Sequence, residues 1–200
     1  GALTQSGDIE IDVADNKTLT YSGASLSLGA NTLTLSGGGT LSNTHPLALD
    51  NADSLLTLAG ILTIGDVDGT AAASNSGKGI KVTSSATLGD YDLSAESYLD
   101  IAADKTLGGQ LNLQSNGELN ISGSGEYIGD IALAGGKFSA VDNQELSGTL
   151  SVTADSELAV ASGYTLELSQ AGGLSLGANT LILSGGGTLE SGVLYLDNAS

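Results

Sequence analysis

The chain has 200 residues, and its 5 basic residues against 23 acidic ones give a formal net charge of −18. All the basic residues are lysines, and we expect no nucleic-acid partner, because phosphate neutralisation needs clustered Lys and Arg. The sequence has no cysteine, which excludes disulfides and thiolate chemistry, and no apolar run of about 18 residues that would predict membrane insertion.

Very short strands are predicted along the chain by triplets in which two apolar residues flank one residue that is usually polar. Alternation over three residues places both outer side chains on one side of a strand, where they can form a core. Gly, Ser, Thr and Asn fill the gaps, and no apolar stripe with the 3.6-residue period of a helix occurs. In chain order the triplets are 9–11, 19–21, 26–28, 33–35, 47–49, 56–58, 62–64, 80–82, 99–101, 111–113, 119–121, 131–133, 150–152, 158–160, 166–168, 174–176, 181–183 and 194–196.

Tight corners are predicted between the triplets by clusters of Gly, Asn, Asp and Ser, such as residues 29–31, 36–39 and 122–125. In the regular stretches the triplets begin 7 or 8 residues apart, which is too close for hairpins with strands of usual length. Three steps form a coil of about 22 residues. The chain is therefore predicted to be an all-β parallel β-helix, or β-solenoid, of about nine coils.

The coil length also predicts which side chains lie over one another. Leu19, Leu41 and Leu62 are expected to form one column through the core. Residues 68–79 contain no triplet, so they are predicted to form a loop at a corner or a coil lined by the alanines of residues 71–73.

A much longer repeat is superimposed on the coils. Residues 26–41 read LSLGANTLTLSGGGTL, and residues 174–189 match them at all but one of sixteen positions. The difference is Thr34 in the first copy and Ile182 in the second. This identity indicates duplication of a whole structural segment.

The likeness extends on both sides, so that residues 2–53 resemble residues 149–200. Residues 1–200 are interpreted as a single solenoid segment that contains one repeat of about 147 residues and the start of a second. Neither end has the polar cap that solenoids use to protect an open coil. We therefore expect a longer repeat array, with adjoining repeats of the same chain as its first partners.

Segments such as TLTLSGGGTLSN (residues 32–43), with Gly/Asn/Asp corners, acidic composition and no cysteine, resemble the repetitive passenger regions of autotransporters and filamentous-haemagglutinin-type adhesins of Gram-negative bacteria. The resemblance implies a right-handed β-solenoid stalk that is secreted or displayed at the cell surface. It also implies a non-catalytic structural or adhesive role and a host or surface glycan or protein as ligand. Trimeric fibres use short β-coils too, so a monomer and a homotrimer are both open.

The candidates for sugar chemistry are two acidic pairs, Asp66/Asp68 and Asp90/Asp92. Glycoside hydrolysis needs two carboxylates facing one cleft, and residues i and i+2 of a strand share a face. Glycines flank both pairs, however, which predicts solvated corners, and the sequence has no Trp to stack a sugar. His45, the only histidine, has no Ser or Asp partner at recognisable spacing and is interpreted as a corner residue. We expect no catalytic residue; the alternative is a polysaccharide-hydrolysing β-helix enzyme.

Calcium is the ligand hypothesis that the acidic residues support. Hard cations need several oxygen ligands, and residues 65–69 read Gly-Asp-Val-Asp-Gly. Asp66 and Asp68 are therefore the metal candidates, with Asp50 and Asp53 as a second pair, although neither pair continues as an EF-hand loop. A calcium-stiffened adhesive module is a further alternative, and no other cofactor is expected.

Overall fold

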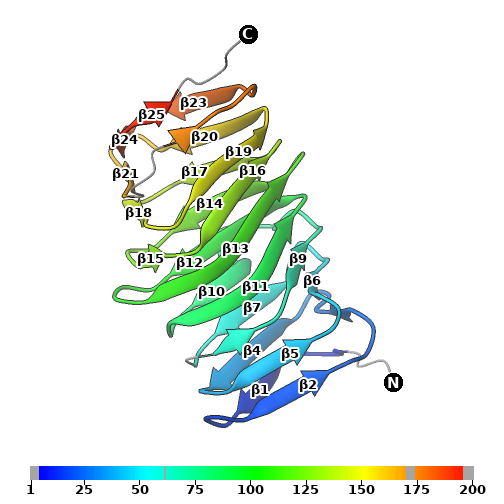
Figure 1. The fold of residues 1–200 in the computed structure, drawn as a ribbon. Coiled ribbons are helices and arrows are strands. Elements are labelled where there is room, and N and C mark those ends of the chain that lie inside the picture. The colour runs from blue at the N-terminus through cyan, green and yellow to red at the C-terminus, as the bar shows by residue number, and fades with distance from the viewer. Residues whose placement is uncertain (1–4, 61, 170–173, 196–200) are drawn as a thin grey trace.

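The computed structural model describes residues 5–60, 62–169 and 174–195, which form an all-β solenoid (Figure 1). The chain winds through about eight turns that lie about 22 residues apart, and the described residues contain no helix. Strand β1 lies at one end of the stack and β23 at the other (Figure 1). The predicted parallel β-solenoid is confirmed, and the expected count of about nine coils is close.

The first face of the solenoid is a nine-stranded sheet to which successive coils contribute one strand each. All its strand pairs are parallel. In order, its strands are β1 (Ile9–Val13), β4 (Thr32–Gly37), β7 (Leu55–Leu58), β10 (Gly79–Val82), β12 (Glu96–Ile101), β14 (Glu118–Ser122), β17 (Lys137–Ala140), β20 (Ser156–Val160) and β23 (Leu181–Gly185).

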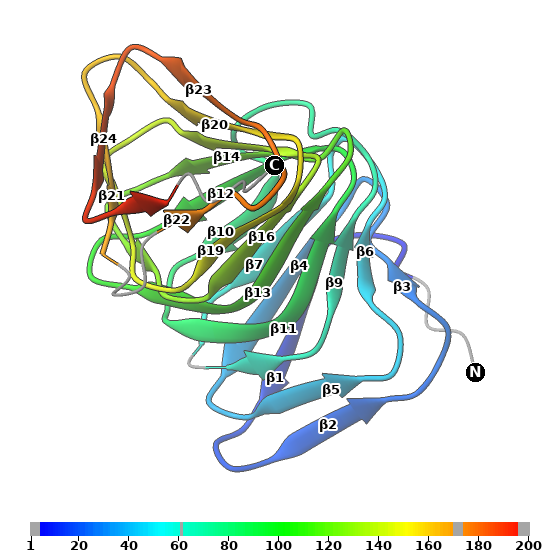
Figure 2. The same ribbon diagram turned by 45° about the horizontal axis from the view of Figure 1, so that its top comes forward.

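The second and third faces share a 14-stranded sheet, because two long strands continue from one face onto the other (Figure 2). The second face contains β2 (Thr18–Tyr21), β5 (Thr40–Asn43), β8 (Thr63–Ile64), β11 (Ala86–Leu93), β13 (Thr106–Gln114), β15 (Glu126–Tyr127), β18 (Gln144–Leu146), β21 (Thr165–Leu168) and β24 (Thr188–Ser191). The third contains β3 (Leu26–Ser27), β6 (Leu47–Leu49), β9 (Val67–Gly69), the ends of β11 and β13, β16 (Asp130–Ala134) and β19 (Leu150–Ala154). Beyond β19, β22 (Leu174–Ser175) and β25 (Leu194–Tyr195) pair with each other in a separate two-stranded sheet.

Parallel pairing places like side chains over one another through the core. Leu33 of β4 pairs with Ile9 of β1 on one side and with Leu56 of β7 on the other. Leu33 and Leu35 are fully buried, whereas Thr34 between them is half-buried on the outer side of the strand. The outer residues of this triplet therefore point inward, as the alternation predicts.

One predicted column is shifted. Leu19 pairs with Leu41 as expected, but Leu41 pairs with Ile64 and not with Leu62. Strand β8 begins at Thr63, so this coil is longer than the regular spacing and Leu62 is buried just before the strand.

Aromatic side chains contribute to the core at a few positions. Phe138 is fully buried, and Tyr91 and Tyr127 are almost fully buried. The Tyr91 hydroxyl lies 2.9 Å from Ser97 Oγ, and the Tyr127 hydroxyl donates to the Gly109 carbonyl at 3.1 Å. Burial raises the pKa of both tyrosines far above the usual range, so both hydroxyls stay neutral inside the solenoid.

The segment without a triplet forms a loop at a corner, between β9 and β10, and not a coil lined by alanines. Ala72 is exposed. The loop is joined to neighbouring coils by backbone hydrogen bonds from Ala73 N to Glu96 O at 2.9 Å and from Ser74 N to Ala52 O at 2.7 Å.

The two copies of the long repeat occupy equivalent places. Strands β4 and β23 lie on the first face and β5 and β24 on the second, and β23 lies seven places after β4 in the nine-stranded sheet. The corner after each first-face strand needs glycine, since Gly37 and Gly185 have φ angles of +92° and +93°. A Cβ at either position would also overlap the carbonyl oxygen of Val13 or of Val160.

Candidate functional site

The two acidic pairs singled out in the sequence lie side by side on neighbouring coils. Asp68 of β9 and Asp92 of β11 are register partners, and Asp66 Oδ1 accepts a hydrogen bond from Asp90 N at 3.0 Å. Asp68 and Asp92 alternate with buried residues, so they lie in strands with their side chains outward and not at corners. The structure therefore brings the two pairs together on neighbouring coils, through the pairing of Asp68 with Asp92 and the hydrogen bond from the Asp90 backbone to Asp66, and we call these four residues the aspartate cluster.

Electrostatics differ within this aspartate cluster. Partial burial raises the pKa of Asp68 above its ordinary 3.8, and the negative charges of Asp92 and Asp66 raise it further. Asp92 Oδ1 accepts a 2.7 Å hydrogen bond from Asn112 Nδ2 on the following coil. Because folding raises the pKa of the Asp68 carboxyl group, the folded state favours its protonated form. The free energy of unfolding therefore falls as the pH rises from 3.8 through the raised pKa.

The surface around Asp68 and Asp92 is a small hollow. Its volume is about 180 Å³, and Thr70, Ser94 and Gln114 complete its lining. Within the described ranges, no group of three or more His, Cys, Asp and Glu side chains is placed so that it could hold a metal ion. The arrangement offers two adjacent carboxylates and neutral hydrogen-bonding groups on an outward sheet surface.

The other predicted acidic pair, Asp50 and Asp53, is used in corner hydrogen bonds. Asp50 Oδ1 accepts from Gly29 N at 3.2 Å, and Asp53 Oδ1 accepts from Ser74 Oγ at 2.6 Å. These partners belong to coils on opposite sides of the pair, so each carboxylate links two neighbouring corners.

His45 is exposed at the corner between β5 and β6. Its Nδ1 lies 3.3 Å from Thr44 Oγ1, and its carbonyl accepts a hydrogen bond from Asn43 Nδ2 at 2.9 Å. The same Asn43 amide donates to the Asp66 carbonyl at 3.0 Å, so this corner is tied to the next coil.

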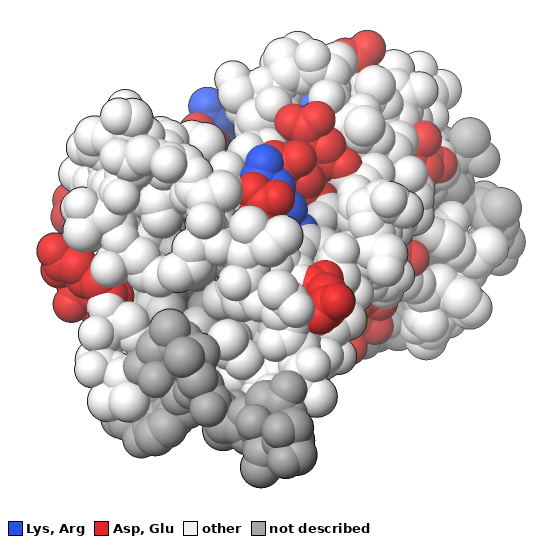
Figure 3. All heavy atoms as spheres, turned by 90° about the horizontal axis from the view of Figure 1, so that it is seen from above, with Lys and Arg blue, Asp and Glu red and all other residues white. Residues whose placement is uncertain are grey.

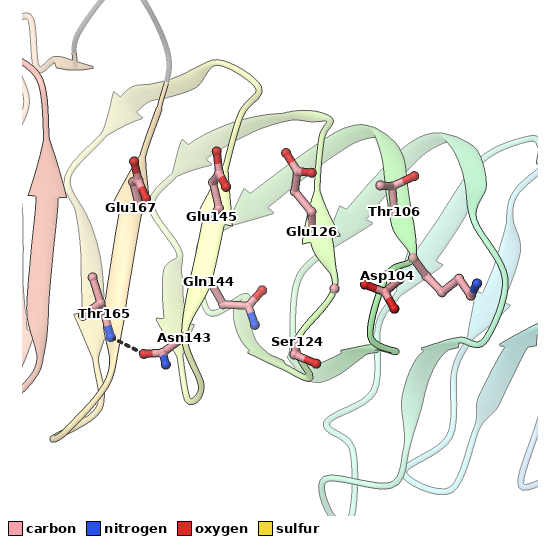
Figure 4. A pocket seen from close by; sticks show the side chains of 11 residues that line it. Asp104, Thr106, Ser124, Glu126, Asn143, Gln144, Glu145, Thr165 and Glu167 are labelled. Atoms are coloured by element: carbon pink, nitrogen blue, oxygen red, sulfur yellow. Dashed lines mark hydrogen bonds between the residues drawn. The ribbon is translucent and has the colours of Figure 1, made fainter.

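A column of glutamates on the second face was missed by sequence reasoning. Glu145, Glu167 and Glu190 are successive register partners, and the pairing of β15 with β18 places Glu126 beside Glu145. Figure 4 shows the side chains of Glu126, Glu145 and Glu167 in a row on adjacent strands. These three glutamates line a groove of about 560 Å³, whose other lining residues are Asp104, Lys105, Thr106, Ser124, Gly125, Asn143, Gln144 and Thr165.

A second column on the first face contains its own cation. Glu96, Glu118, Lys137 and Glu157 are successive register partners. Lys137 Nζ lies 2.9 Å from Glu118 Oε1, and this hydrogen bond, followed by the charges of nearby glutamates, raises the pKa of Lys137. In the part of the chain that the structure describes, no such ion pair joins the second-face column.

Spacing along the chain was the signal for both columns. Their members are outward residues of successive coils, about 22 residues apart, but most of them lie outside the apolar triplets that predict the strands. Seen from the end that carries β23, acidic side chains form separate clusters, and a few lysines lie against them (Figure 3). The outer surface is therefore organised in columns, in the same way as the core.

Comparisons with protein-family models, with curated proteins and with solved structures found no match for this chain. Among the described residues, no helix is long and apolar enough to cross a membrane.

Proposed function

We propose that this chain forms part of a non-catalytic shaft in a secreted or cell-surface adhesin of a Gram-negative bacterium. The observation that carries the proposal is the continuity of the inward columns from coil to coil, with polar and acidic residues at the outward positions. Repetition of this kind sets length and stiffness, because each coil contacts only its neighbours. Binding of a host or surface ligand then belongs to side chains added on this scaffold.

Surface charge supports the same role. A net charge of −18 keeps neighbouring shafts apart by mutual repulsion and maintains solubility. Core residues such as Leu35 and Leu58 are fully buried within one chain, so a second chain is not needed to cover them. This favours a monomeric shaft over a homotrimer.

The proposal is tested by light scattering and by a screen of polysaccharides for binding and sugar release. We expect the mass of one chain and no release of sugar. Asp92→Asn is the informative variant and Asp50→Asn the matched control, since Asp50 accepts a corner hydrogen bond away from the aspartate cluster. Sugar release that Asp92→Asn abolishes and Asp50→Asn preserves would disprove a non-catalytic shaft.

A polysaccharide hydrolase is the second candidate, and one observation favours it. Asp68 and Asp92 lie on adjacent strands, whose spacing of about 4.8 Å is close to the carboxylate separation of about 5–5.5 Å in retaining glycosidases. The raised pKa of Asp68 suits a general acid beside the carboxyl group of Asp92. The hollow of about 180 Å³ is small for a sugar chain, however, and nearby Tyr91 is buried and so offers no stacking surface.

Calcium binding at Asp66 and Asp68 remains a prediction. Asp92, the register partner of Asp68, supplies extra negative charge that would attract a cation. In the described residues, however, no three such side chains are placed together to hold a metal ion. The test is the melting temperature with and without millimolar calcium. Loss of the rise in Asp66→Ala/Asp68→Ala would assign the ion to that pair, and loss in Asp50→Ala/Asp53→Ala would assign it to the second candidate pair. No rise with calcium in the unmodified chain would overturn the calcium-stiffened module.

A further inference from the structure

The groove beside the second-face glutamate column gathers negative charge. Four of its lining residues are acidic, and Lys105 is the one basic residue among them. Glu126, Glu145 and Glu167 follow one another on adjacent parallel strands, so about 4.8 Å separates the backbone of each from the next. Among the described residues, no ion pair joins Lys105 to any of these glutamates. The groove therefore presents a row of carboxylates, which act only as hydrogen-bond acceptors.

A buried amide oxygen in the wall of the same groove has no hydrogen-bond partner. Gln144 is only 4% exposed, and its Oε1 accepts no hydrogen bond within the described structure. Its Nε2 donates to the Gly123 carbonyl at 2.6 Å, which fixes the orientation of the amide, because the reversed amide would place two oxygens together. In Figure 4 this amide lies between the row of glutamates and Ser124. An unpaired buried acceptor is costly, so a ligand that donates a hydrogen bond here is favoured.

The first-face column shows which chemical group neutralises such a row. Lys137 lies between Glu118 and Glu157 in register, and its Nζ lies 2.9 Å from Glu118 Oε1. The Lys137 and Glu118 side chains are 33% and 32% exposed, so this ammonium is held at an outward surface of the solenoid, as a ligand in the groove would be. An ammonium group has three donors and no acceptor, which complements carboxylates. For the second-face column, a ligand with ammonium groups would supply the same chemistry.

The spacing of the column favours an extended cation over a single metal ion. Within the described ranges, no three acidic side chains are placed so that they could hold a metal ion. Carboxylates about 4.8 Å apart instead match two amines joined by three methylene groups, because the four N–C and C–C bonds between such amines extend about 5 Å. An extended peptide matches less well, because its side chains on one face recur about 6.6 Å apart. The groove of about 560 Å³ has the volume of a small-molecule site.

We propose that this groove binds a linear polyamine in which three methylene groups separate successive ammonium groups. The ligand lies along the solenoid axis, with one ammonium beside each of Glu126, Glu145 and Glu167, and one of its N–H groups donates to Gln144 Oε1. Binding of this kind is electrostatic and weakens as the salt concentration rises. The inference goes beyond the proposed shaft function and does not depend on it.

The experiment titrates the 200-residue chain with bis(3-aminopropyl)amine at low ionic strength and measures binding by calorimetry. Glu145→Gln, in the centre of the column, should weaken binding about two- to fivefold, which is the effect of one exposed ion pair. Glu145→Gln/Glu167→Gln should weaken it further. The matched control is Glu10→Gln, which removes the same charge from an exposed position in β1 and should leave binding unchanged. The melting temperature of each variant shows that it is folded.

Two further ligands test the spacing and the chemistry of the site. Bis(hexamethylene)triamine, whose amines are about 9 Å apart when extended, should bind more weakly at the same ionic strength. Calcium should displace the first triamine no better than magnesium does, because the column offers no chelating group of carboxylates.

Four results would overturn the proposal. The first is no binding of bis(3-aminopropyl)amine at low ionic strength, and the second is an equal loss in Glu10→Gln and Glu145→Gln, which would show diffuse attraction only. The third is equal affinity for the two triamines, and the fourth is displacement by calcium but not by magnesium, which would indicate a metal site. None of these results affects the polysaccharide screen, so failure of this proposal and failure of the non-catalytic shaft are distinguishable.

Discussion

Residues 26–41 and 174–189 show the same sequence in two environments. The first segment lies between coils on both sides. In the second, β22 pairs with β25, but β23 and β24 have a described neighbouring strand on one side only. Backbone conformation is the same in both, as the matching glycine corners show, but the fully buried Leu35 corresponds to Leu183, which is 53% exposed. The residues therefore determine the shape of a coil, and the next coil determines how much of it is buried.

The largest expected difference between the copies is at the equivalent leucines. Leu35→Ala should lower the free energy of unfolding by about 2–5 kcal/mol, because it leaves a cavity between coils. Leu183→Ala should change it by about 0.5 kcal/mol or less, because the side chain is already half in solvent. Urea unfolding of the two variants measures both values. Equal losses would show that the two environments do not differ in solution.

Substitutions at the two corner glycines test conformational strain, which is the same in both copies, separately from burial, which differs between them. Gly37→Ala and Gly185→Ala should each cost about 1–3 kcal/mol, since both residues have positive φ angles and both approach a backbone oxygen of the preceding coil. That preceding coil is present in both copies, so here the copies should behave alike. Thermal unfolding reports on Gly37→Ala, and hydrogen exchange in β24 reports on Gly185→Ala. A cost at Gly37 alone would mean that the second corner relaxes freely.

The aspartates that precede each copy should give a smaller effect. Asp8 Oδ1 accepts from Thr32 N and Asp155 Oδ1 accepts from Thr180 N, both at 2.7 Å. Asp8→Ala and Asp155→Ala should each lower stability by about 0.5–1.5 kcal/mol through loss of this hydrogen bond. Urea unfolding midpoints measure the change, and Asp12→Ala at the end of β1 is a control for loss of one negative charge. A loss as large for Asp12→Ala would assign the effect to charge and not to the hydrogen bond.

Much of the fold could be predicted from the sequence because each triplet carries its own inward and outward pattern. Leu33, Thr34 and Leu35 illustrate this, since local alternation alone assigns all three. The order in which the coils stack follows from the average spacing between equivalent triplets. An error of one or two residues in the predicted length of a coil therefore does not change the predicted architecture.

The aspartate cluster could not be predicted, because side-chain proximity between coils requires the length of each coil. A spacing of 22 residues would place Asp68 beside Asp90, but the coil is two residues longer and pairs Asp68 with Asp92. The register of β11 against β13 also shifts between Thr87 and Asp90, which no triplet indicates. The glutamate columns could not be predicted for the same reason, because a register shift of one residue changes which charged side chains lie side by side.

The smallest expected effect is at the only position where the two segments differ. Thr34 is half-buried and outward, and Ile182 is 56% exposed, so Thr34→Ile and Ile182→Thr should each change stability by about 0.5 kcal/mol or less. Both residue types are β-branched and suit a strand, which keeps the backbone term small. Light scattering of the Ile182→Thr variant also tests assembly, because a homotrimer built on this face would need an apolar contact through Ile182. We expect the mass of one chain before and after Ile182→Thr; a trimer that dissociates on this substitution would show that this face of the second copy is a contact between chains.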